Sequence, residues 1–219
     1  MNNIILDSIS LQDRIFLESI PADNCLDTIV EAMKKGRRVH IGYRKYASDE
    51  ITARMIEPYF IKLHKRRWYV IARQIENGKL KMENSAGAQR DSGFRTFSFD
   101  RIVDAVISKE KFTIPKDFDA KAYFDDCFGV MRDERYPAQR IVLRALNREK
   151  FYMEDLPVHH TQRKIAEGDG YTDYEVCLRP TSDFIAYVLS RGAWLKVMEP
   201  KSVVQMVTDN ITAMSKLYE

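Results

Sequence analysis

The sequence predicts an α+β protein in which a helical segment and a small β-barrel precede an α+β sandwich. Before Gly36 apolar residues recur at helical spacing, and from Gly36 to about Pro115 they alternate in short runs typical of strands. After Pro137 the patterns follow the order strand, helix, strand, strand, helix, strand, which is the order of a split βαβ sandwich. We therefore expect a helical segment at 1–35, a barrel domain at 36–115, a connector at 116–137 and an α+β domain at 138–219.

The composition is typical of a folded protein from a reducing compartment. Of the 219 residues, 45% are apolar and 11% aromatic, which is enough for a buried core. No run approaches the roughly 18 apolar residues of a membrane-spanning helix, and the amino terminus does not resemble a signal peptide. Cys25, Cys127 and Cys177 are odd in number and far apart, which argues against a disulfide framework or a Cys-x-x-Cys zinc site. We expect a cytoplasmic protein.

Two helices are expected before the barrel. Residues 11–20 have the spacing of one helix, and a second is expected from a cap at Asp23 or Asn24 to Lys35, with Gly36 as its stop.

A β-hairpin is expected over 54–73, where two apolar runs flank the basic tip at 64–67. Neighbouring strand residues point to opposite faces, so one face of the return strand can fill a core while the other presents a phenol beside a guanidinium. The first face carries Trp68, Val70 and Ala72, and the second Tyr69, Ile71 and Arg73. Asn77-Gly78 predicts a second hairpin turn, and 84–93 a loop.

The elements of the carboxyl-terminal half are expected in a regular succession. Strands are predicted at 140–146, 158–166, 171–178 and 194–198. Helices are predicted at 147–155, from Thr181 or Ser182 to Ser190, and at 200–218, and a short helix within 120–128 ends at Gly129.

The net charge of +3 conceals a strong asymmetry. Residues 34–73 hold twelve Lys and Arg against three acids, a net +9, so the other 179 residues sum to −6. Such a run can simply be a solvated face. Its interleaving with aromatics favours an anionic partner, because rings and guanidinium groups together suit stacked bases and phosphates. These aromatics are Tyr43, Tyr46, Tyr59, Trp68 and Tyr69.

Four elements in this half of the chain resemble the WYL domain family. They are Val39–Tyr43 as the first strand, Arg54-Met-Ile-Glu-Pro58-Tyr, the triplet Trp68-Tyr69-Val70, and the closing run Arg95-Thr-Phe-Ser-Phe-Asp-Arg-Ile102. Val70 stands where the family name has Leu, and it keeps an apolar strand residue. The resemblance implies an SH3/Sm-like barrel.

A second block, Val188–Pro200, resembles the end of the WCX extension that follows WYL domains, which implies a ferredoxin-like fold for 138–219. In the family this pair of domains usually follows a winged helix-turn-helix that reads duplex DNA. The helices expected before Gly36 are too short and too acidic to supply one. The chain therefore resembles the sensing half of a transcriptional regulator.

Enzymatic signatures are missing from the sequence. It has no Walker A motif, nucleophile elbow, zincin motif or dinucleotide fingerprint. His159 and His160, as neighbours in an expected strand, would point apart and could not chelate one metal ion. We expect no enzyme, no metal and no cofactor.

The expected binding residues come from the barrel. The family places basic residues of its closing motif in a groove proposed for negatively charged ligands, and Arg95 and Arg101 match these positions. Arg101 can instead pair with Asp100 or Asp104, and Trp68 is favoured as a core residue. The candidate ligand-binding residues are Tyr43, Arg54, Trp68, Tyr69, Arg73, Arg95 and Arg101.

Two functions fit these observations. In the first, a nucleotide or single-stranded nucleic acid binds the barrel groove of a regulatory sensor, and duplex DNA is read by a domain outside this chain. In the second, the chain is a structural dimerisation module that holds nucleic-acid backbone nonspecifically. A homodimer is expected in both, because apolar helix faces would otherwise stay uncovered. These faces carry Leu26, Ile29, Val30 and Met33, and Ile211, Met214 and Leu217.

Overall fold

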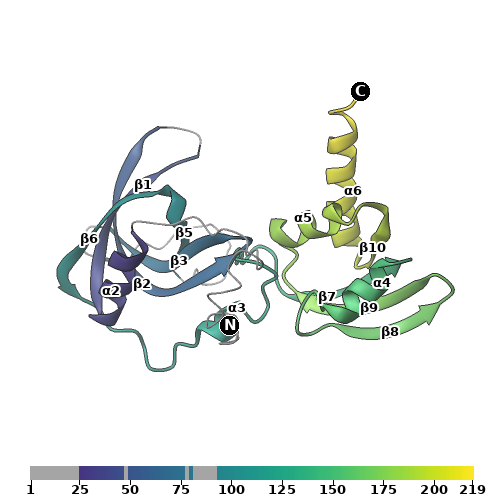
Figure 1. Ribbon diagram of the computed structural model, residues 1–219, viewed down its shortest axis with the longest axis horizontal. Helices are drawn as coiled ribbons and strands as arrows, with labels where there is room; N and C mark the ends of the chain where they lie inside the picture. The colour runs from purple at the N-terminus through teal and green to yellow at the C-terminus, as the bar shows by residue number, and fades with distance from the viewer. Residues whose placement is uncertain (1–24, 47–48, 77–78, 81–92) are drawn as a thin grey trace, which may run out of the picture. The chain divides into compact units, whose positions relative to one another are not determined.

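The computed structural model describes residues 25–46, 49–76, 79–80 and 93–219 (Figure 1). These residues form a mixed α+β protein with two antiparallel sheets, which confirms the predicted fold class. The chain divides into two compact units. The first holds the described residues up to Ile75 together with Phe97–Phe112, and the second holds the remainder. None of the described helices combines the length and apolarity needed to cross a bilayer.

The first sheet has the strand order β4-β3-β2-β1-β6, and β5 pairs with β3. Its elements are α2 (Leu26–Lys34), β1 (Arg37–Arg44), β2 (Ile51–His64), β3 (Arg67–Glu76), β4 (Lys79–Leu80), β5 (Phe94–Ser98), the 3₁₀ turn η2 (Phe99–Arg101) and β6 (Ile102–Lys111). The turn η2 connects β5 directly to β6. Because β5 pairs with β3 and β6 pairs with β1, this connection joins strands from opposite ends of the sheet. The hydrogen-bonded path does not close, and the SH3/Sm-like barrel stays a prediction.

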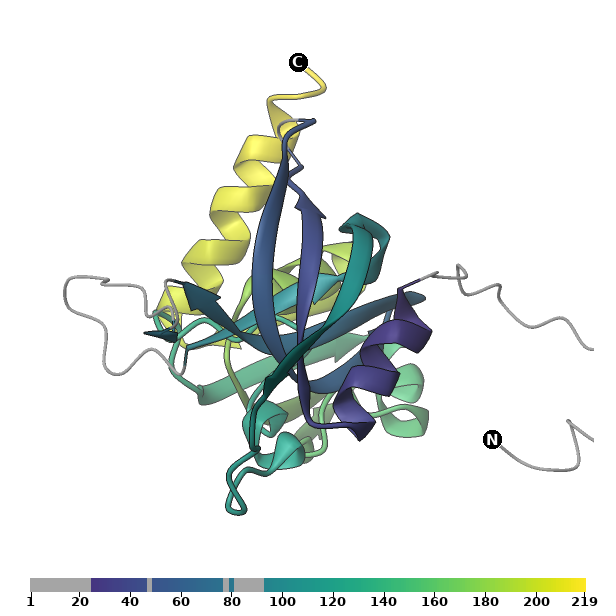
Figure 2. The same cartoon turned by 90° about the vertical axis from the view of Figure 1, so that its left-hand side faces the viewer.

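The core of the first unit lies between α2 and one face of the sheet. Helix α2 contacts β1, β2 and β6 (Figure 2) and buries Ile29 and Ala32 completely. Strand alternation supplies the facing residues, among them Val70 and Ala72, and the half-buried Trp68 packs against them. Gly36, with φ of +58°, makes the turn from α2 into β1 that a side chain would strain.

The predicted β2–β3 hairpin is confirmed, with His64 paired to Arg67. The two tip residues, Lys65 and Arg66, have φ of +46° and +63°. Two-residue hairpin turns require this left-handed conformation and usually hold Asn-Gly, because side chains with a bulky Cβ are strained there. Lys65 and Arg66 therefore destabilise the turn relative to Asn-Gly.

The second unit contains a four-stranded antiparallel sheet of order β10-β7-β9-β8. Its elements are α3 (Ala120–Phe124), β7 (Gln139–Leu146), α4 (Glu149–Asp155), β8 (Arg163–Gly168), β9 (Tyr171–Leu178), α5 (Ser182–Ser190), the 3₁₀ turn η3 (Gly192–Trp194), β10 (Leu195–Glu199) and α6 (Lys201–Ser215). From β7 to β10 this is the predicted order of strands and helices.

The two faces of this sheet have opposite chemistry. One face packs its apolar residues, such as Leu143 and Val176, against Met153, Phe184 and Val203 of α4, α5 and α6. The other face carries ion pairs between neighbouring strands. They join Arg144 to Asp173 (2.7 Å), and Arg140 and Arg163 to Glu175. Hydrogen bonds from Arg140 and Arg163 lower the pKa of Glu175.

Two predictions about this unit were wrong. His159 and His160 lie in a turn and not in a strand, because Gln162 ties that turn to Val158 N (2.8 Å) and Met153 O (2.6 Å); β8 therefore begins only at Arg163. The short helix α3 ends at Phe124, four residues before its predicted end. The helix expected at 11–20, the Asn77-Gly78 turn and almost all of the 84–93 loop lie outside the described residues.

Candidate functional site

Arg54 is held on the core-facing side of β2 by two neutral partners. Its Nε donates to Thr52 Oγ1 (3.2 Å) and its Nη1 donates to Gln74 Oε1 (2.9 Å). Thr52 in turn donates to the carbonyl of Tyr43, its partner across β1 and β2. The guanidinium group is thus fixed in position by partners that carry no charge.

Two aromatic rings lie beside the guanidinium group of Arg54. The ring of Tyr43 meets that of Phe97 edge to face, with centroids 5.1 Å apart, and both rings are nearly fully buried. Arg54 Cζ lies 5.6 Å from the Tyr43 centroid and 5.8 Å from that of Phe97. These distances allow a cation–π interaction. The Tyr43 hydroxyl accepts from the backbone N–H of Ser98 (3.4 Å), which connects β1 to β5.

Arg101, at the end of η2, is the second guanidinium of this cluster. Its Cζ lies 4.6 Å from the centroid of Tyr43 and 3.7 Å from that of Tyr46, a side chain that is 74% exposed. Its Nε donates to the carbonyl of Arg44 (2.9 Å). Arg101 therefore lies between a buried and an exposed ring, and within the described part of the chain a single hydrogen bond fixes its orientation.

Neither of the two acids that the sequence offers to Arg101 pairs with it among the described residues. Asp100 pairs with Arg67 (3.4 Å), whose other Nη donates to the hydroxyl of Tyr46 (3.1 Å). Asp104 packs over Gly42, where a Cβ would come within 1.9 Å of its Oδ1. Among the described residues, neither Arg54 nor Arg101 pairs with an acid. We call Tyr43, Tyr46, Arg54, Phe97 and Arg101 the guanidinium cluster.

The other predicted binding residues occupy different places. Arg73, on the opposite face of β3 from Trp68, lies with Cζ 5.2 Å from the centroid of Tyr59. Tyr69 forms a side-chain hydrogen bond with Arg67 at the edge of the cluster. Arg95 is half-buried in β5, and its Nη1 donates to the carbonyl of Phe94 (2.9 Å). Trp68 packs on the core. Of the seven candidates, the structure brings three into one cluster: Arg54 and Arg101 both lie near the ring of Tyr43.

Four contributors were not among the predicted site residues: Tyr46, Thr52, Gln74 and Phe97. Tyr46 belongs to the aromatics interleaved with the basic stretch, which was the available signal. Gln74 and Phe97 carry no local signal, because their contacts with Arg54 come from residues 20 or more positions away.

The neighbouring histidines of the second unit, His159 and His160, lie ring against ring. Their ring centroids lie 4.2 Å apart, and His160 Nε2 lies 3.2 Å from Asp125. Burial, and secondarily His160, lower the pKa of His159, whose Nδ1 lies 2.8 Å from Thr161 Oγ1. Across the described ranges no three His, Cys, Asp or Glu side chains are grouped as a metal site.

Comparison with known proteins gives a family match over the amino-terminal half of the chain. The WYL domain family model matches residues 24–107. The chain contains a WYL domain. That domain carries the whole guanidinium cluster as well as Trp68 and Tyr69.

Two solved structures resemble this WYL-domain chain. Proteasome accessory factor B/C (PafBC) of Arthrobacter aurescens is 19% identical, with a TM-score of 0.39, over 88% of this chain and 27% of that one. A CRISPR Cas-related protein is 12% identical, with a TM-score of 0.47, over 87% of this chain and 51% of that one. The chain thus spans about a quarter and about half of their lengths. Among curated proteins, none matches.

Proposed function

We propose that the chain is the ligand-sensing part of a WYL-family transcriptional regulator and that its guanidinium cluster binds an anionic ligand. The ligand is a nucleotide or a short single-stranded nucleic acid. One observation carries this proposal: Arg54 and Arg101 flank Tyr43, and in the described part of the chain neither is neutralised by a carboxylate.

The chemistry of the cluster favours a phosphate beside a base. Arg54 uses Nε and Nη1 and leaves Nη2, and Arg101 uses only Nε and leaves both terminal nitrogens, when partners among the described residues are counted. Terminal guanidinium nitrogens can bind phosphate oxygens as a fork, which a lysine cannot do. The exposed ring of Tyr46 offers a surface on which a base can stack, as in other single-strand binding proteins.

The remaining parts of the proposal concern the second unit and the assembly. We infer that 138–219 is the WCX extension with a ferredoxin-like fold, supported by the strand order β10-β7-β9-β8 and the helices between the strands. We also infer that the barrel is of the SH3/Sm type, supported by the direct link from β5 through η2 to β6. The chain has a regulatory and not an enzymatic role, and it acts as a homodimer.

A titration of labelled single-stranded oligonucleotide into the 219-residue chain at 50 and 200 mM salt tests the proposal. Two phosphate contacts predict that affinity falls only roughly sevenfold between these salt concentrations, because log K falls by about 0.7 per contact for each tenfold rise in salt. Binding should saturate at one site per chain and depend on oligonucleotide length. The alternative, nonspecific backbone binding by a dimerisation module, predicts a loss of roughly 300-fold for six contacts. That steeper loss, or no binding at low salt, would refute the sensor proposal.

A further inference from the structure

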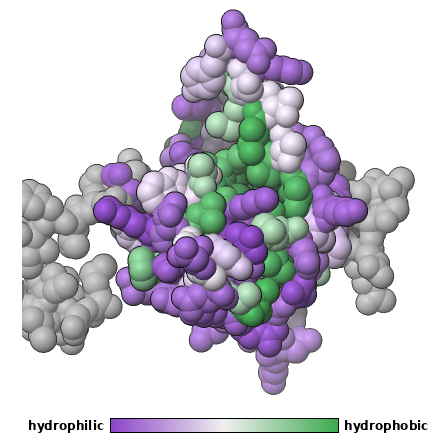
Figure 3. Space-filling view, turned by 90° about the vertical axis from the view of Figure 1, so that its right-hand side faces the viewer, coloured by the Kyte–Doolittle hydropathy of each residue, from purple (hydrophilic) through white to green (hydrophobic). Residues whose placement is uncertain are grey.

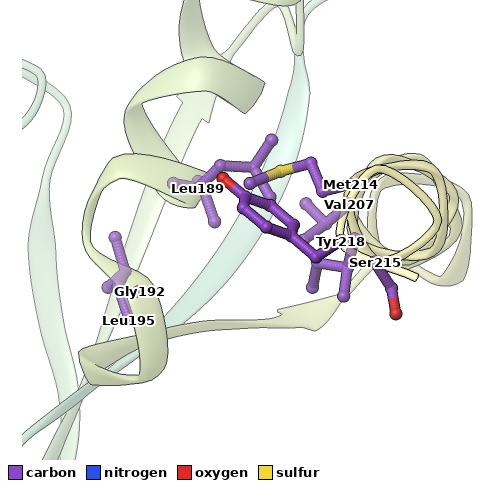
Figure 4. Close-up of a pocket in the computed structure, with 9 residues that line it drawn as sticks. Leu189, Gly192, Leu195, Val207, Met214, Ser215 and Tyr218 are labelled. Atoms are coloured by element: carbon purple, nitrogen blue, oxygen red, sulfur yellow. The ribbon is translucent and has the colours of Figure 1, made fainter.

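Helices α5 and α6 border two cavities of different chemistry. The first measures about 340 Å³ and runs along the carboxyl-terminal half of α6, where Figure 4 shows Val207, Met214 and Tyr218 on one side and Leu189 on the other. Its lining is almost entirely apolar, and a band of hydrophobic surface is visible on the face of the molecule that Figure 3 shows. The second measures about 500 Å³ and has polar as well as apolar walls, so it can select a ligand by hydrogen bonds.

Three segments of the second unit form the walls of the second cavity. They are the end of the connector at 131–136, helix α5 with the residue before it, and the middle of α6. The apolar part of the lining includes Met131, Ile185, Leu189 and Met206. Cavities of this size hold small organic molecules, and their walls are typically apolar with a few polar groups that orient the ligand.

The connector wall of this cavity is held in place by hydrogen bonds from within the protein. Asp183 Oδ2 accepts from the backbone N–H groups of Val130 (3.0 Å) and Met131 (3.2 Å). Arg179, which is only 7% exposed, donates from Nη1 to the carbonyl of Tyr136 (3.1 Å). A wall that is already fixed lowers the entropy that a ligand must overcome when it binds.

A buried hydroxyl group at the wall of the cavity lacks a partner. Thr181 is 1% exposed and lies at the N-cap position of α5, yet its side chain makes no capping hydrogen bond. Among the described residues, none bonds to its Oγ1. Buried hydroxyl groups are nearly always hydrogen-bonded, because burying one without a partner costs stability. Since Thr181 also lines the cavity, its hydroxyl is available to a ligand there.

The charged side chains of the lining compensate each other. Among its described residues only Asp133 and Arg135 carry a charge, and Arg135 donates from Nε to Oδ1 (3.0 Å) and from Nη2 to Oδ2 (2.6 Å) of Asp133. The side-chain hydrogen bond from Arg135 lowers the pKa of Asp133, so at neutral pH the carboxylate is ionised and the pair is neutral overall. A charged ligand would lose its hydration here without meeting an opposite charge that is still unpaired.

We propose that this second cavity binds an uncharged small molecule with an apolar body and one hydrogen-bonding group, such as a hydroxyl, and that Thr181 recognises this group. The apolar body packs against Ile185 and Met206, and the hydrogen-bonding group pairs with Thr181 Oγ1. The site lies entirely in the second unit and uses no residue of the guanidinium cluster. It therefore does not depend on ligand binding by the WYL domain.

Nuclear magnetic resonance of the full chain with methyl-labelled methionine tests this proposal with three probes of similar shape. The probes are phenethyl alcohol, ethylbenzene, which lacks the hydroxyl, and phenylacetate, which carries a charge. Phenethyl alcohol should shift the methyl signals of Met131 and Met206, which line the second cavity. The signals of Met153 in the core and of Met214 in the first cavity should stay in place. Phenethyl alcohol should also bind more tightly than either of the other probes.

Two variants and a control separate the role of the hydroxyl from that of the cavity shape. Thr181→Val keeps the shape, so it should weaken binding of phenethyl alcohol by roughly two- to twelvefold, the scale of one neutral hydrogen bond, and leave binding of ethylbenzene unchanged. Its thermal midpoint should be at least that of the wild type, because no hydrogen bond within the described residues is lost. Ala186→Trp should fill the cavity and abolish binding. Thr208→Val, at an exposed site on α6 outside the lining, should bind like the wild type.

Three results would overturn the proposal. Phenylacetate that binds as tightly as phenethyl alcohol would show that the cavity accepts a charged ligand. A Thr181→Val protein that binds phenethyl alcohol like the wild type would show that the hydroxyl does not recognise the ligand. Shifts at Met214 in place of Met131 and Met206, or no shift at millimolar concentrations of the probe, would show that the second cavity is not the binding site.

Discussion

The carboxylate of Asp100 pairs with Arg67, at 3.4 Å, and not with Arg101, the next residue in the chain. The 3₁₀ turn η2 directs the two neighbouring side chains to different places. Arg101 is held instead by the carbonyl of Arg44 and by the rings of Tyr43 and Tyr46. This arrangement gives the WYL domain a guanidinium group that is positioned but not neutralised.

Replacing Arg101 by Ala is expected to weaken binding of a single-stranded oligonucleotide by roughly 1.5–3 kcal/mol, the scale of lost charge-assisted hydrogen bonds. The thermal midpoint should stay close to that of the wild type, because the side chain forms one hydrogen bond and no ion pair within the described residues. Fluorescence anisotropy and a melting curve measure the two effects. Arg66→Ala, at the hairpin tip, is the control and should bind normally. An Arg101→Ala protein that melts early but binds normally would show a structural role.

The loss of stability on replacing an aromatic residue of the first unit should increase with the burial of that residue. Phe99 is 1% exposed, so Phe99→Ala should cost about 3–5 kcal/mol of unfolding free energy, as for other buried aromatics. Trp68 is only half-buried against the same core, so Trp68→Ala should cost less, about 2–3 kcal/mol. Urea unfolding of both variants tests this order, and a Trp68 variant as unstable as the Phe99 variant would contradict it.

The hairpin tip should be stabilised by glycine. Arg66 has φ of +63°, which costs a residue with a Cβ about 1–2 kcal/mol and costs glycine much less. Arg66→Gly is therefore expected to raise the unfolding free energy by about 1 kcal/mol, whereas Arg66→Ala keeps the strain and should change it little. Chemical denaturation compares the two variants. Equal stability of both would mean that the turn is not strained.

Cysteine reactivity should separate Cys127 from Cys177. Burial, and then the neighbouring Asp126, raise the pKa of Cys127 to about 11, whereas Cys177 is exposed. At pH 8 the Cys127 thiolate is therefore scarce, and iodoacetamide should modify Cys177 first, as peptide mass spectrometry would show. Rapid modification of Cys127 in the folded protein at pH 8 would contradict the buried environment.

The same shift has a consequence for stability. Between about pH 9 and 11 the folded state keeps a proton on Cys127 that the unfolded state loses, so the unfolding free energy should fall as pH rises through this window. Cys127→Ala should remove that part of the pH dependence. An unchanged pH dependence in this variant would show that another group is responsible.

Sequence by itself determined the features that depend on local periodicity. Alternation along β3 placed Trp68, Val70 and Ala72 on one face, and the structure packs all three on the core of the first unit. The succession of strands and helices after Pro137 was also determined locally, since burying an apolar face sets the period of each element. The turn at His159 could not be predicted from local periodicity, because it depends on a hydrogen bond from the Gln162 side chain to the carbonyl of Met153.

Only the tertiary structure decided which charges meet. Arg101 is 57 residues from Arg44 and Asp100 is 33 from Arg67, and which of these groups pair depends on how β1, β3 and η2 come together. Arg73 was expected among the ligand-binding residues, yet its guanidinium group lies over Tyr59, on the face of β3 opposite Trp68. Strand alternation states which residues share a face but not which strands become neighbours. The fold brings Tyr43, Arg54 and Arg101 together because β1 pairs with both β2 and β6, and η2 leads directly into β6.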